Sequence, residues 1–381
     1  MKTIDRTIYN RVLSSLQDED FVIVIYGPRQ AGKTTLLKLL QRKLNSEVLM
    51  LNGDTARVQQ VLSSRDVVAM RTYLGTNKYV FIDEAQRIQD IGINLKIIKD
   101  QMPDLKIVAT GSSSFELASK INEPLTGRKR VFMLYPLWAS ELASFGGSTF
   151  LSDNRENILK FGSYPKIIQL ESEQAKIRYL QEVVEVSLYK DILELEDVKN
   201  PKMLREILAL LAFQIGNEVS YNELANALSV SIEMIKRYLD LLEKAFIIIR
   251  IGPYSRNLRK EITANSRYYF IDMGIRNTII RNYNPLSLRN DVGMIWENFL
   301  AMERVKKQLY TDIFVNNYFW RTWDGQEVDW MEEREGQLFG YEFKWNIDKA
   351  RQAKPPKDFM GTYDNASFMS ISQHNYFDFI L

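Results

Sequence analysis

A run of apolar residues that leads directly into a glycine-rich loop constrains the fold of this 381-residue chain more than any other feature. Residues 21–26 (FVIVIY) are apolar and rich in β-branched side chains, which predicts a buried parallel strand. The next residues, 27–34, follow the pattern G-x-x-x-x-G-K-T, and an apolar helical pattern continues through residues 36–40. A strand, a glycine-rich loop and a helix in this order are typical of a P-loop, so the sequence predicts a site for a nucleoside triphosphate.

Each part of this loop has its own expected role. The glycines allow backbone N–H groups to point at phosphate oxygens, and the helix N-terminus adds partial positive charge. We expect Lys33 to reach the β- and γ-phosphates and the Thr34 hydroxyl to bind Mg²⁺. The loop residues predicted to bind ATP are Gly27, Pro28, Arg29, Gln30, Ala31, Gly32, Lys33, Thr34 and Thr35.

An acidic motif follows about fifty residues after the P-loop lysine. Residues 78–84 (KYVFIDE) predict a buried strand that ends in Asp83 and Glu84, the Walker B pattern. We expect Asp83 to bind Mg²⁺ beside the nucleotide and Glu84 to polarise the attacking water. The alternative is a strand end whose acids face solvent. Thr110 and Ser112, at the end of a third predicted strand, are candidate sensors of the γ-phosphate.

A cationic loop at residues 125–130 (LTGRKR) holds one further catalytic candidate. Arg128 is predicted either to act as an arginine finger on a neighbouring subunit of a homo-oligomer or to be a solvated loop cation.

Composition excludes several kinds of site. The chain has no cysteine, which excludes disulfides, thiolate catalysis and Cys-based zinc sites, and its single histidine is His374. Metal chemistry must then use carboxylates, which favours Mg²⁺ or Mn²⁺. The net charge of +2 is too small to indicate nucleic acid by itself, and no apolar run approaches the ~20 residues of a membrane span. We expect no membrane partner and a cytoplasmic location.

The middle of the chain predicts a winged helix-turn-helix. Helical patterns begin at Met203, after Ser220 and after Ser231, and two strands follow at residues 246–250 and 267–271. Residues 250–267 carry five basic and one acidic side chain, whereas the acids and bases of the third helix cancel. Binding of double-stranded DNA and a role as a protein-interaction module both remain open.

A hairpin near the C-terminus places charges on one face. If its turn is centred on residues 335–336, Asp329 lies opposite Glu342 and Glu327 lies opposite Lys344, all on the same side. Carboxylates ~5 Å apart repel each other, so the pair needs a cation, which can be Lys344 or a divalent metal. The alternative is a solvent-facing ladder of ion pairs. We expect Trp320, Trp323, Trp330 and Trp345 to be core aromatics.

Five motifs together resemble a prokaryotic family of AAA-type ATP-binding proteins whose C-terminal domain, of unknown role, is related to PD-(D/E)xK nucleases. They lie at residues 27–35, 81–86, 110–114, 135–138 and 162–165. The resemblance implies that Asp329 and Glu342 bind a second Mg²⁺ or Mn²⁺ and that Lys344 acts on the phosphate and its attacking water. Glu297 matches the acid that these nucleases often carry on their first helix.

The sequence thus predicts three domains. Residues 1–148 are expected to form an α/β P-loop ATPase core, residues 149–284 a helical segment with a winged helix, and residues 285–381 an α/β domain like that of restriction endonucleases. One hypothesis is a Mg²⁺-dependent ATPase coupled to DNA binding, with nuclease activity added. The other is an ATP-controlled regulatory or protein-interaction switch whose nuclease-like domain is catalytically inactive.

Overall fold

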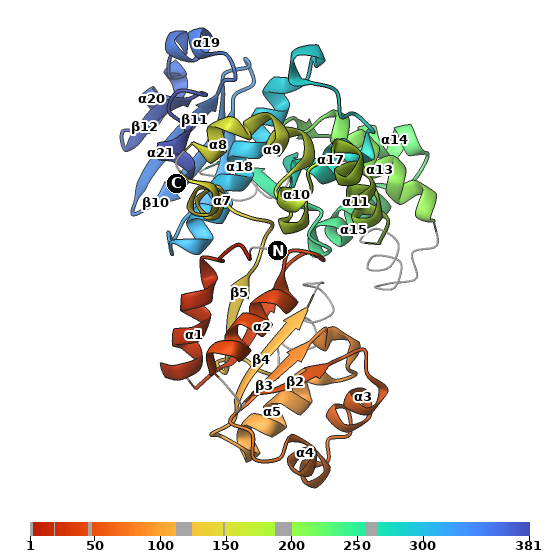
Figure 1. Ribbon diagram of the computed structural model, residues 1–381. Helices are drawn as coiled ribbons and strands as arrows, with labels where there is room; N and C mark the ends of the chain where they lie inside the picture. The colour runs from red at the N-terminus through yellow and green to blue at the C-terminus, as the bar shows by residue number, and fades with distance from the viewer. Residues whose placement is uncertain are drawn as a thin grey trace. The chain divides into compact units, whose positions relative to one another are not determined.

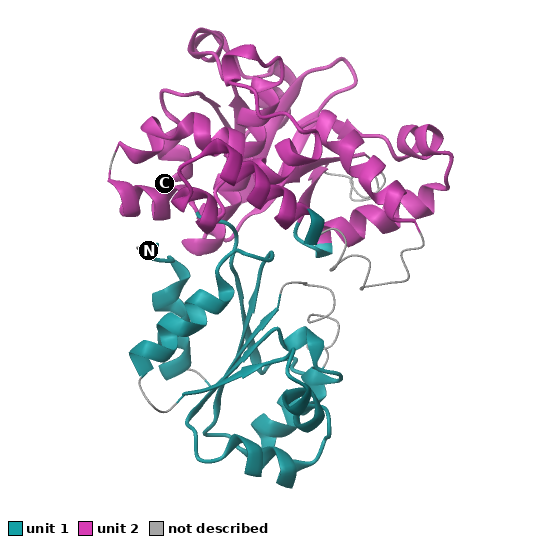
Figure 2. Cartoon of the chain, turned by 45° about the vertical axis from the view of Figure 1, so that its right-hand side comes forward, with its two compact units in different colours: residues 1–137, 185–198, 244–246 teal, residues 138–184, 199–243, 247–381 magenta. Residues whose placement is uncertain are grey.

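The computed structural model of the chain describes residues 3–18, 20–44, 48–111, 124–147, 149–186, 200–255 and 265–381. The chain divides into two compact units, which are coloured separately in Figure 2. Unit 1 comprises Met1–Leu137, Glu185–Val198 and Lys244–Phe246, and unit 2 comprises Trp138–Val184, Lys199–Glu243 and Ile247–Leu381.

Unit 1 is built on a parallel sheet of five strands in the order β2-β3-β4-β1-β5 (Figure 1). Every residue of β1 and β3 is buried, as their apolar sequences predict. The strands are β1 (Val22–Tyr26), β2 (Val48–Asn52), β3 (Tyr79–Asp83), β4 (Lys106–Gly111) and β5 (Lys129–Met133). The helices are α1 (Ile8–Asp18), α2 (Lys33–Leu44), α3 (Ala56–Leu62), α4 (Val67–Leu74), the short 3₁₀-helix η2 (Ala85–Arg87) and α5 (Ile91–Gln101). The predicted P-loop core is confirmed as a parallel α/β sheet.

The first helices of unit 2 precede the region in which the sequence predicts a winged helix. They are α7 (Ala139–Gly146), α8 (Phe150–Asp153), α9 (Arg155–Phe161), α10 (Pro165–Gln169) and α11 (Glu173–Val186). The next helices, α13 (Pro201–Phe213), α14 (Tyr221–Leu228) and α15 (Ile232–Lys244), bury the apolar faces that the sequence pattern predicts. The Ser220 hydroxyl accepts a hydrogen bond from the Glu223 N–H at 3.3 Å and so caps α14.

One mixed sheet of seven strands runs through the rest of unit 2, in the order β12-β11-β10-β9-β7-β8-β6. Its strands are β6 (Glu218–Val219), β7 (Ile248–Pro253), β8 (Ser266–Phe270), β9 (Asn316–Arg321), β10 (Glu327–Arg334), β11 (Gln337–Phe343) and β12 (Ala366–Ile371). Strands β7 and β8 pair in an antiparallel ribbon, and β7 also pairs in parallel with β9. The sheet therefore continues across residue 284, where the sequence suggests a domain boundary; the three predicted domain limits remain predictions.

The remaining helices of unit 2 are α17 (Met273–Ile279), η4 (Leu286–Leu288), α18 (Val292–Tyr310), α19 (Ile347–Gln352), α20 (Lys357–Thr362) and α21 (Tyr376–Ile380). The hairpin of β10 and β11 has the predicted register, because Trp330 pairs with Tyr341 and Met331 with Gly340. Trp320 and Trp330 are buried, as predicted, and Trp345 is half-buried. The prediction for Trp323 is wrong: it lies in the turn between β9 and β10 and is fully exposed.

Candidate functional site

The P-loop joins the end of β1 to the start of α2, so its backbone lies at the N-terminus of a helix. Gln30 and Gly32 have positive φ angles of 62° and 102°, which shape the loop. Gly27 is required by close packing, since a Cβ there would lie 2.1 Å from the Leu134 carbonyl oxygen. Lys33 opens α2 with its side chain buried, and its Nζ donates to the carbonyl oxygens of Gly27 at 2.8 Å and Pro28 at 2.9 Å. The Lys33 side chain thus contacts the backbone of the P-loop, where the phosphates are predicted to bind.

The carboxylate of Asp83 lies at the end of β3, between hydroxyl groups of two neighbouring elements. The Thr34 hydroxyl of α2 donates to Oδ2 at 2.6 Å, and the Thr110 hydroxyl of β4 donates to Oδ1. Threonine and aspartate oxygens are hard ligands of the kind that Mg²⁺ binds in P-loop sites. The two predicted magnesium ligands are therefore adjacent, and the donor set fits the ion.

Glu84 follows Asp83 in a left-handed backbone conformation, with φ 53° and ψ 42°. Its Oε2 accepts a hydrogen bond from the Gln86 side-chain amide. This contact holds the carboxylate that is predicted to orient water. Gln86 was not assigned a role from the sequence alone. Ser112, the other predicted γ-phosphate sensor, lies outside the described residues.

Arg128 lies beside the start of strand β1, and not at the end of that strand where the P-loop begins. Its carbonyl oxygen accepts from the Val22 N–H at 2.9 Å, at the start of β1, whereas the P-loop follows the end of this five-residue strand. Five residues of strand span roughly 16 Å. The guanidinium forms an ion pair with Asp100 of α5. The geometry places Arg128 away from its own P-loop, and its guanidinium is partly exposed. The trans finger and the solvated loop cation therefore both stay predictions.

Unit 2 brings together the acidic side chains that the sequence singles out near the C-terminus. They are Glu297 of α18, Glu327 and Asp329 of β10, and Glu342 of β11. The hairpin register places Asp329 next to the Trp330–Tyr341 pair, and its Oδ2 accepts from the Phe343 N–H at 2.8 Å. Burial raises the pKa of Glu297 and of Glu342, and the negative charge of Asp329 raises both pKa values further.

A buried arginine that sequence reasoning missed lies among these carboxylates. Arg267 of β8 is only 3% exposed, and its guanidinium nitrogens lie 3.1 Å from Glu327 Oε2, 3.5 Å from Glu297 Oε1 and 3.7 Å from Asp329 Oδ1. The guanidinium also lies over the Phe319 ring, 4.6 Å from its centre. No motif in the sequence marks Arg267 as a member of the cluster, because it lies on another strand, 62 residues before Asp329.

The remaining members of the cluster are also partnered within the chain. Lys344 forms an ion pair with Glu342, and the Tyr269 hydroxyl donates to Glu297 Oε1 at 2.8 Å. Across the residues that the structure describes, no three histidine, aspartate or glutamate side chains are arranged to hold a metal ion. The roles of Asp329 and Glu342 as metal ligands therefore stay predictions.

Three parts of the chain match known domain families. Residues 19–143 match an AAA domain family. Residues 152–286 and 292–373 match two domains of unknown function, DUF8612 and DUF4143. A Walker-type ATPase of Pyrococcus abyssi shares the fold, with a TM-score of 0.51 and 17% identity, over 73% of this chain and 96% of that chain.

Two uncharacterized proteins are similar along most of their length. One, from Mycobacterium tuberculosis, is 27% identical over 328 residues, which cover 85% of this chain and 70% of that protein. Another, from Haemophilus influenzae, is 27% identical over 363 residues, covering 90% of this chain and 87% of that protein. The AAA domain match supports an ATPase-like protein that binds ATP, whereas the C-terminal match carries no activity. None of the helices among the described residues has the length and apolar character needed to cross a membrane.

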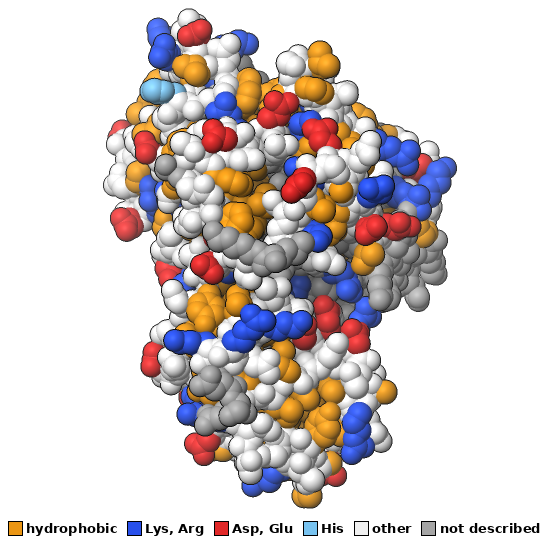
Figure 3. Space-filling model, in the orientation of Figure 1, with side chains coloured by type: hydrophobic (Ala, Val, Ile, Leu, Met, Phe, Trp, Pro, Cys, Tyr) orange, Lys and Arg blue, Asp and Glu red, His pale blue; other side chains and the backbone are white. Residues whose placement is uncertain are grey.

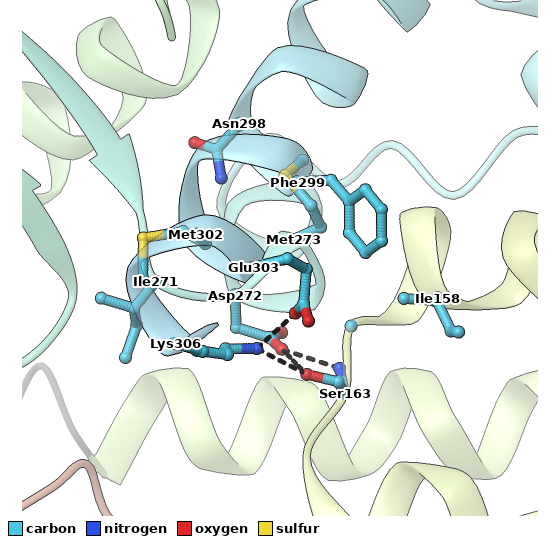
Figure 4. A pocket seen from close by; sticks show the side chains of 11 residues that line it. Ile158, Ser163, Ile271, Asp272, Met273, Asn298, Phe299, Met302, Glu303 and Lys306 are labelled. Carbon is cyan, nitrogen blue, oxygen red and sulfur yellow. Dashed lines mark hydrogen bonds and ion pairs between the residues drawn. The ribbon is translucent and has the colours of Figure 1, made fainter. Parts of the chain in front are cut away.

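The motif at residues 162–165 has a packing role in unit 2. Gly162 leaves room for Asp272, because a Cβ at this position would lie 1.8 Å from the aspartate Oδ1. Asp272 accepts a hydrogen bond from the Ser163 N–H at 2.7 Å, and Lys306 lies 2.7 Å from Glu303 and 3.3 Å from the Ser163 hydroxyl (Figure 4). These side chains border a small, mainly apolar pocket. The Asp272 carboxylate also accepts from the Gly274 N–H at 2.8 Å, so these polar groups have partners within the chain.

Proposed function

We propose that this protein is a Mg²⁺-dependent ATPase that acts as an ATP-controlled switch, with an acidic C-terminal cluster that does not cleave nucleic acid. The observation that carries the ATPase part is the arrangement around Asp83, whose two oxygens meet the hydroxyls of Thr34 and Thr110. Hydroxyl groups hold the carboxylate in place without cancelling its charge, so the site keeps its attraction for Mg²⁺.

Each residue of the nucleotide site then has a defined task. The N–H groups of the loop and Lys33 bind and orient the phosphates, while Thr34 and Asp83 supply oxygen ligands for Mg²⁺, which neutralises phosphate charge when bound. Glu84 orients the attacking water and accepts its proton. Thr110 keeps Asp83 in position through its hydroxyl.

The proposal that the C-terminal cluster does not cleave is supported by Arg267. Its guanidinium supplies, from within the chain, the positive charge that buried carboxylates require. A divalent cation placed among the same oxygens would have to approach this fixed positive charge at short range. The cluster therefore fits an internal ion-pair network between β8, α18 and β10.

A DNA-coupled ATPase with nuclease activity is the alternative, and one observation favours it. Glu297, Asp329 and Glu342 do come together with Lys344, as the resemblance to nucleases implies.

Most of the basic residues expected in the wing lie outside the described residues. On the face shown in Figure 3, acidic and basic side chains are interspersed over unit 2.

One incubation tests both parts of the proposal. The protein is mixed with supercoiled plasmid DNA, with and without ATP and with Mg²⁺ or Mn²⁺, and both phosphate release and nicking are measured. We expect phosphate release that requires Mg²⁺, and no nicking under any condition. Nicking that disappears in Lys344→Ala would establish the nuclease alternative, and absence of phosphate release with and without DNA would contradict the ATPase.

Binding of double-stranded DNA is measured separately at several salt concentrations. Binding that weakens steeply with salt would identify DNA as the partner of the switch, because phosphate contacts release counterions. Weaker binding in Lys236→Ala, on α15, would place part of that contact on the third helix of the predicted winged helix.

A further inference from the structure

A buried arginine near the start of the chain connects two distant backbone segments of unit 1. Arg6 precedes α1 and is 7% exposed. Its Nη1 donates to the Ala31 carbonyl oxygen at 2.6 Å, and its Nη2 donates to the Tyr135 carbonyl oxygen at 2.6 Å. Both are short hydrogen bonds from a charged donor, the stronger kind in proteins. One side chain thus joins carbonyls that lie 25 and 129 residues away from it in the sequence.

The first of these bonds acts on the P-loop itself. In a trans peptide the C=O of one residue and the N–H of the next point in opposite directions. Because Arg6 holds the Ala31 carbonyl on its own side, the Gly32 N–H must point to the other side of the loop. Backbone N–H groups are the donors that a P-loop offers to phosphate. Arg6 therefore determines the orientation of one such donor without standing in the site itself.

The second bond acts on the segment that leaves β5. Residues 134–137, here called the connector, are the last of the long N-terminal part of unit 1, and Trp138 begins unit 2. The Leu134 N–H donates to the Tyr26 carbonyl at 2.7 Å, and the Leu134 carbonyl lies against Gly27, so the connector already contacts the start of the P-loop. Arg6 adds a charged tie between the next residue, Tyr135, and the far side of the same loop.

We propose that Arg6 is a positioning residue that fixes the P-loop to the connector, so that nucleotide binding and the conformation of the connector are thermodynamically linked. The proposal rests on ATP binding at the P-loop. If nucleotide binding alters the loop backbone, the tie carries the change to the connector and toward Trp138. Linkage is reciprocal, so releasing the connector must also weaken nucleotide binding.

Nucleotide affinity gives the first test. In the full-length protein, Arg6→Ala should weaken Mg²⁺–ATP binding on the order of tenfold or more, the effect expected from two buried bonds to a charged donor. Arg6→Lys keeps the charge and should recover part of the affinity. The matched control is Arg71→Ala, since Arg71 also donates to a backbone carbonyl, that of Gln101 at 2.9 Å, but lies on the surface. The control should bind like the wild type.

Tryptophan fluorescence gives the second test, which a merely structural role would not affect. All six tryptophans of the chain lie in unit 2, and Trp138 directly follows the connector. We expect saturating Mg²⁺–ATP to change the emission of the wild type and the change to be largely absent from Trp138→Phe. Arg6→Ala, saturated at its own higher nucleotide concentration, should lose most of this change, whereas Arg71→Ala should keep it.

The outcomes separate this inference from the proposed function. If Lys33→Ala binds ATP like the wild type, the nucleotide site is misassigned. If binding depends on Lys33 but Arg6→Ala has wild-type affinity and a wild-type fluorescence change, the role of Arg6 is overturned alone. If Arg6→Ala fails to fold, Arg6→Lys provides the test. It should bind Mg²⁺–ATP several-fold more weakly than the wild type and show a smaller change in tryptophan emission. Wild-type affinity together with a wild-type emission change would overturn the inference.

Discussion

The two acidic sites of this protein differ in what surrounds their carboxylates. In unit 1, Asp83 is bonded by the hydroxyls of Thr34 and Thr110, which orient it but carry no charge. In unit 2, the cluster around Asp329 contains the guanidinium of Arg267 and the ammonium of Lys344. The first arrangement leaves negative charge available to a metal ion, and the second offsets part of it with cations from within the chain. The groups beside the carboxylates, and not the number of acids, therefore favour metal binding at one site and an ion-pair network at the other.

The largest effects should come from breaking the site of unit 1. Lys33→Ala removes the phosphate contact and should lower ATP hydrolysis on the order of 10²–10³-fold. Glu84→Gln keeps the binding groups but loses the base, so it should retain bound ATP and hydrolyse it ~10²–10⁴-fold more slowly. Phosphate release and retained nucleotide measure the two variants. The exposed Asp104→Asn serves as control, and unchanged hydrolysis in both site variants would refute the assignment.

Arg128 tests whether unit 1 is completed by a second copy of the chain. If Arg128 acts as an arginine finger in trans, Arg128→Ala should lower the rate of ATP hydrolysis ~10³-fold while still binding ATP. Mixing it with Glu84→Gln should restore part of the activity, because one complete interface can form. Asp100→Asn breaks the ion pair but keeps the arginine, and should leave the rate unchanged. A monomer with full Arg128→Ala activity would exclude the finger.

Removing the internal cation should alter unit 2 more modestly. Arg267→Met leaves buried carboxylates uncompensated and should lower the free energy of unfolding by about 3 kcal/mol. Tryptophan emission in urea reports unit 2, where all six tryptophans lie. The control Arg321→Met, whose exposed guanidinium lies 3.4 Å from Glu218, should cost about 0–1 kcal/mol.

Manganese then sharpens the comparison between the two sites. Without nucleotide, Mn²⁺ should stabilise Arg267→Met, because the ion replaces the lost charge, and should leave the unfolding of wild-type unit 2 unchanged. Stabilisation of the wild type that is lost in Asp329→Asn would mean that the cluster is a metal site after all.

We expect the smallest effect in the pH dependence of stability, through the ion pairs of Asp291. The Arg289 and Arg276 guanidiniums bond to Asp291 and hold its pKa at about 2, although burial alone would raise it. A depressed pKa stabilises the folded state above the unfolded value of ~3.9, and this contribution is lost as pH falls toward 2. The difference in unfolding free energy between wild type and Asp291→Asn should therefore shrink as pH falls from about 5 to about 2. A difference independent of pH would contradict the pairing.

The local parts of both sites follow from the sequence. Glycine spacing and an apolar strand predict the P-loop, and period-two alternation around a two-residue turn predicts the register that places Asp329 near Glu342. These features depend on neighbours within a few residues, so the chain specifies them before any long-range contact forms. The exposed Trp323 shows the limit of this reasoning, because composition favours burial whereas its place in a tight turn prevents it.

Tertiary structure alone decided which partners reach these groups. Arg267, Arg6 and Thr110 each contact residues far away in the sequence, and the pairing of β7 with β9 joins the β7–β8 ribbon to the C-terminal strands. A sequence pattern records what a residue is and how its close neighbours repeat, but not which distant side chain will share its buried space. The sequence by itself determined which residues carry the carboxylates and the phosphate-binding groups. Only the tertiary structure decided whether hydroxyl groups or guanidinium groups lie next to those carboxylates.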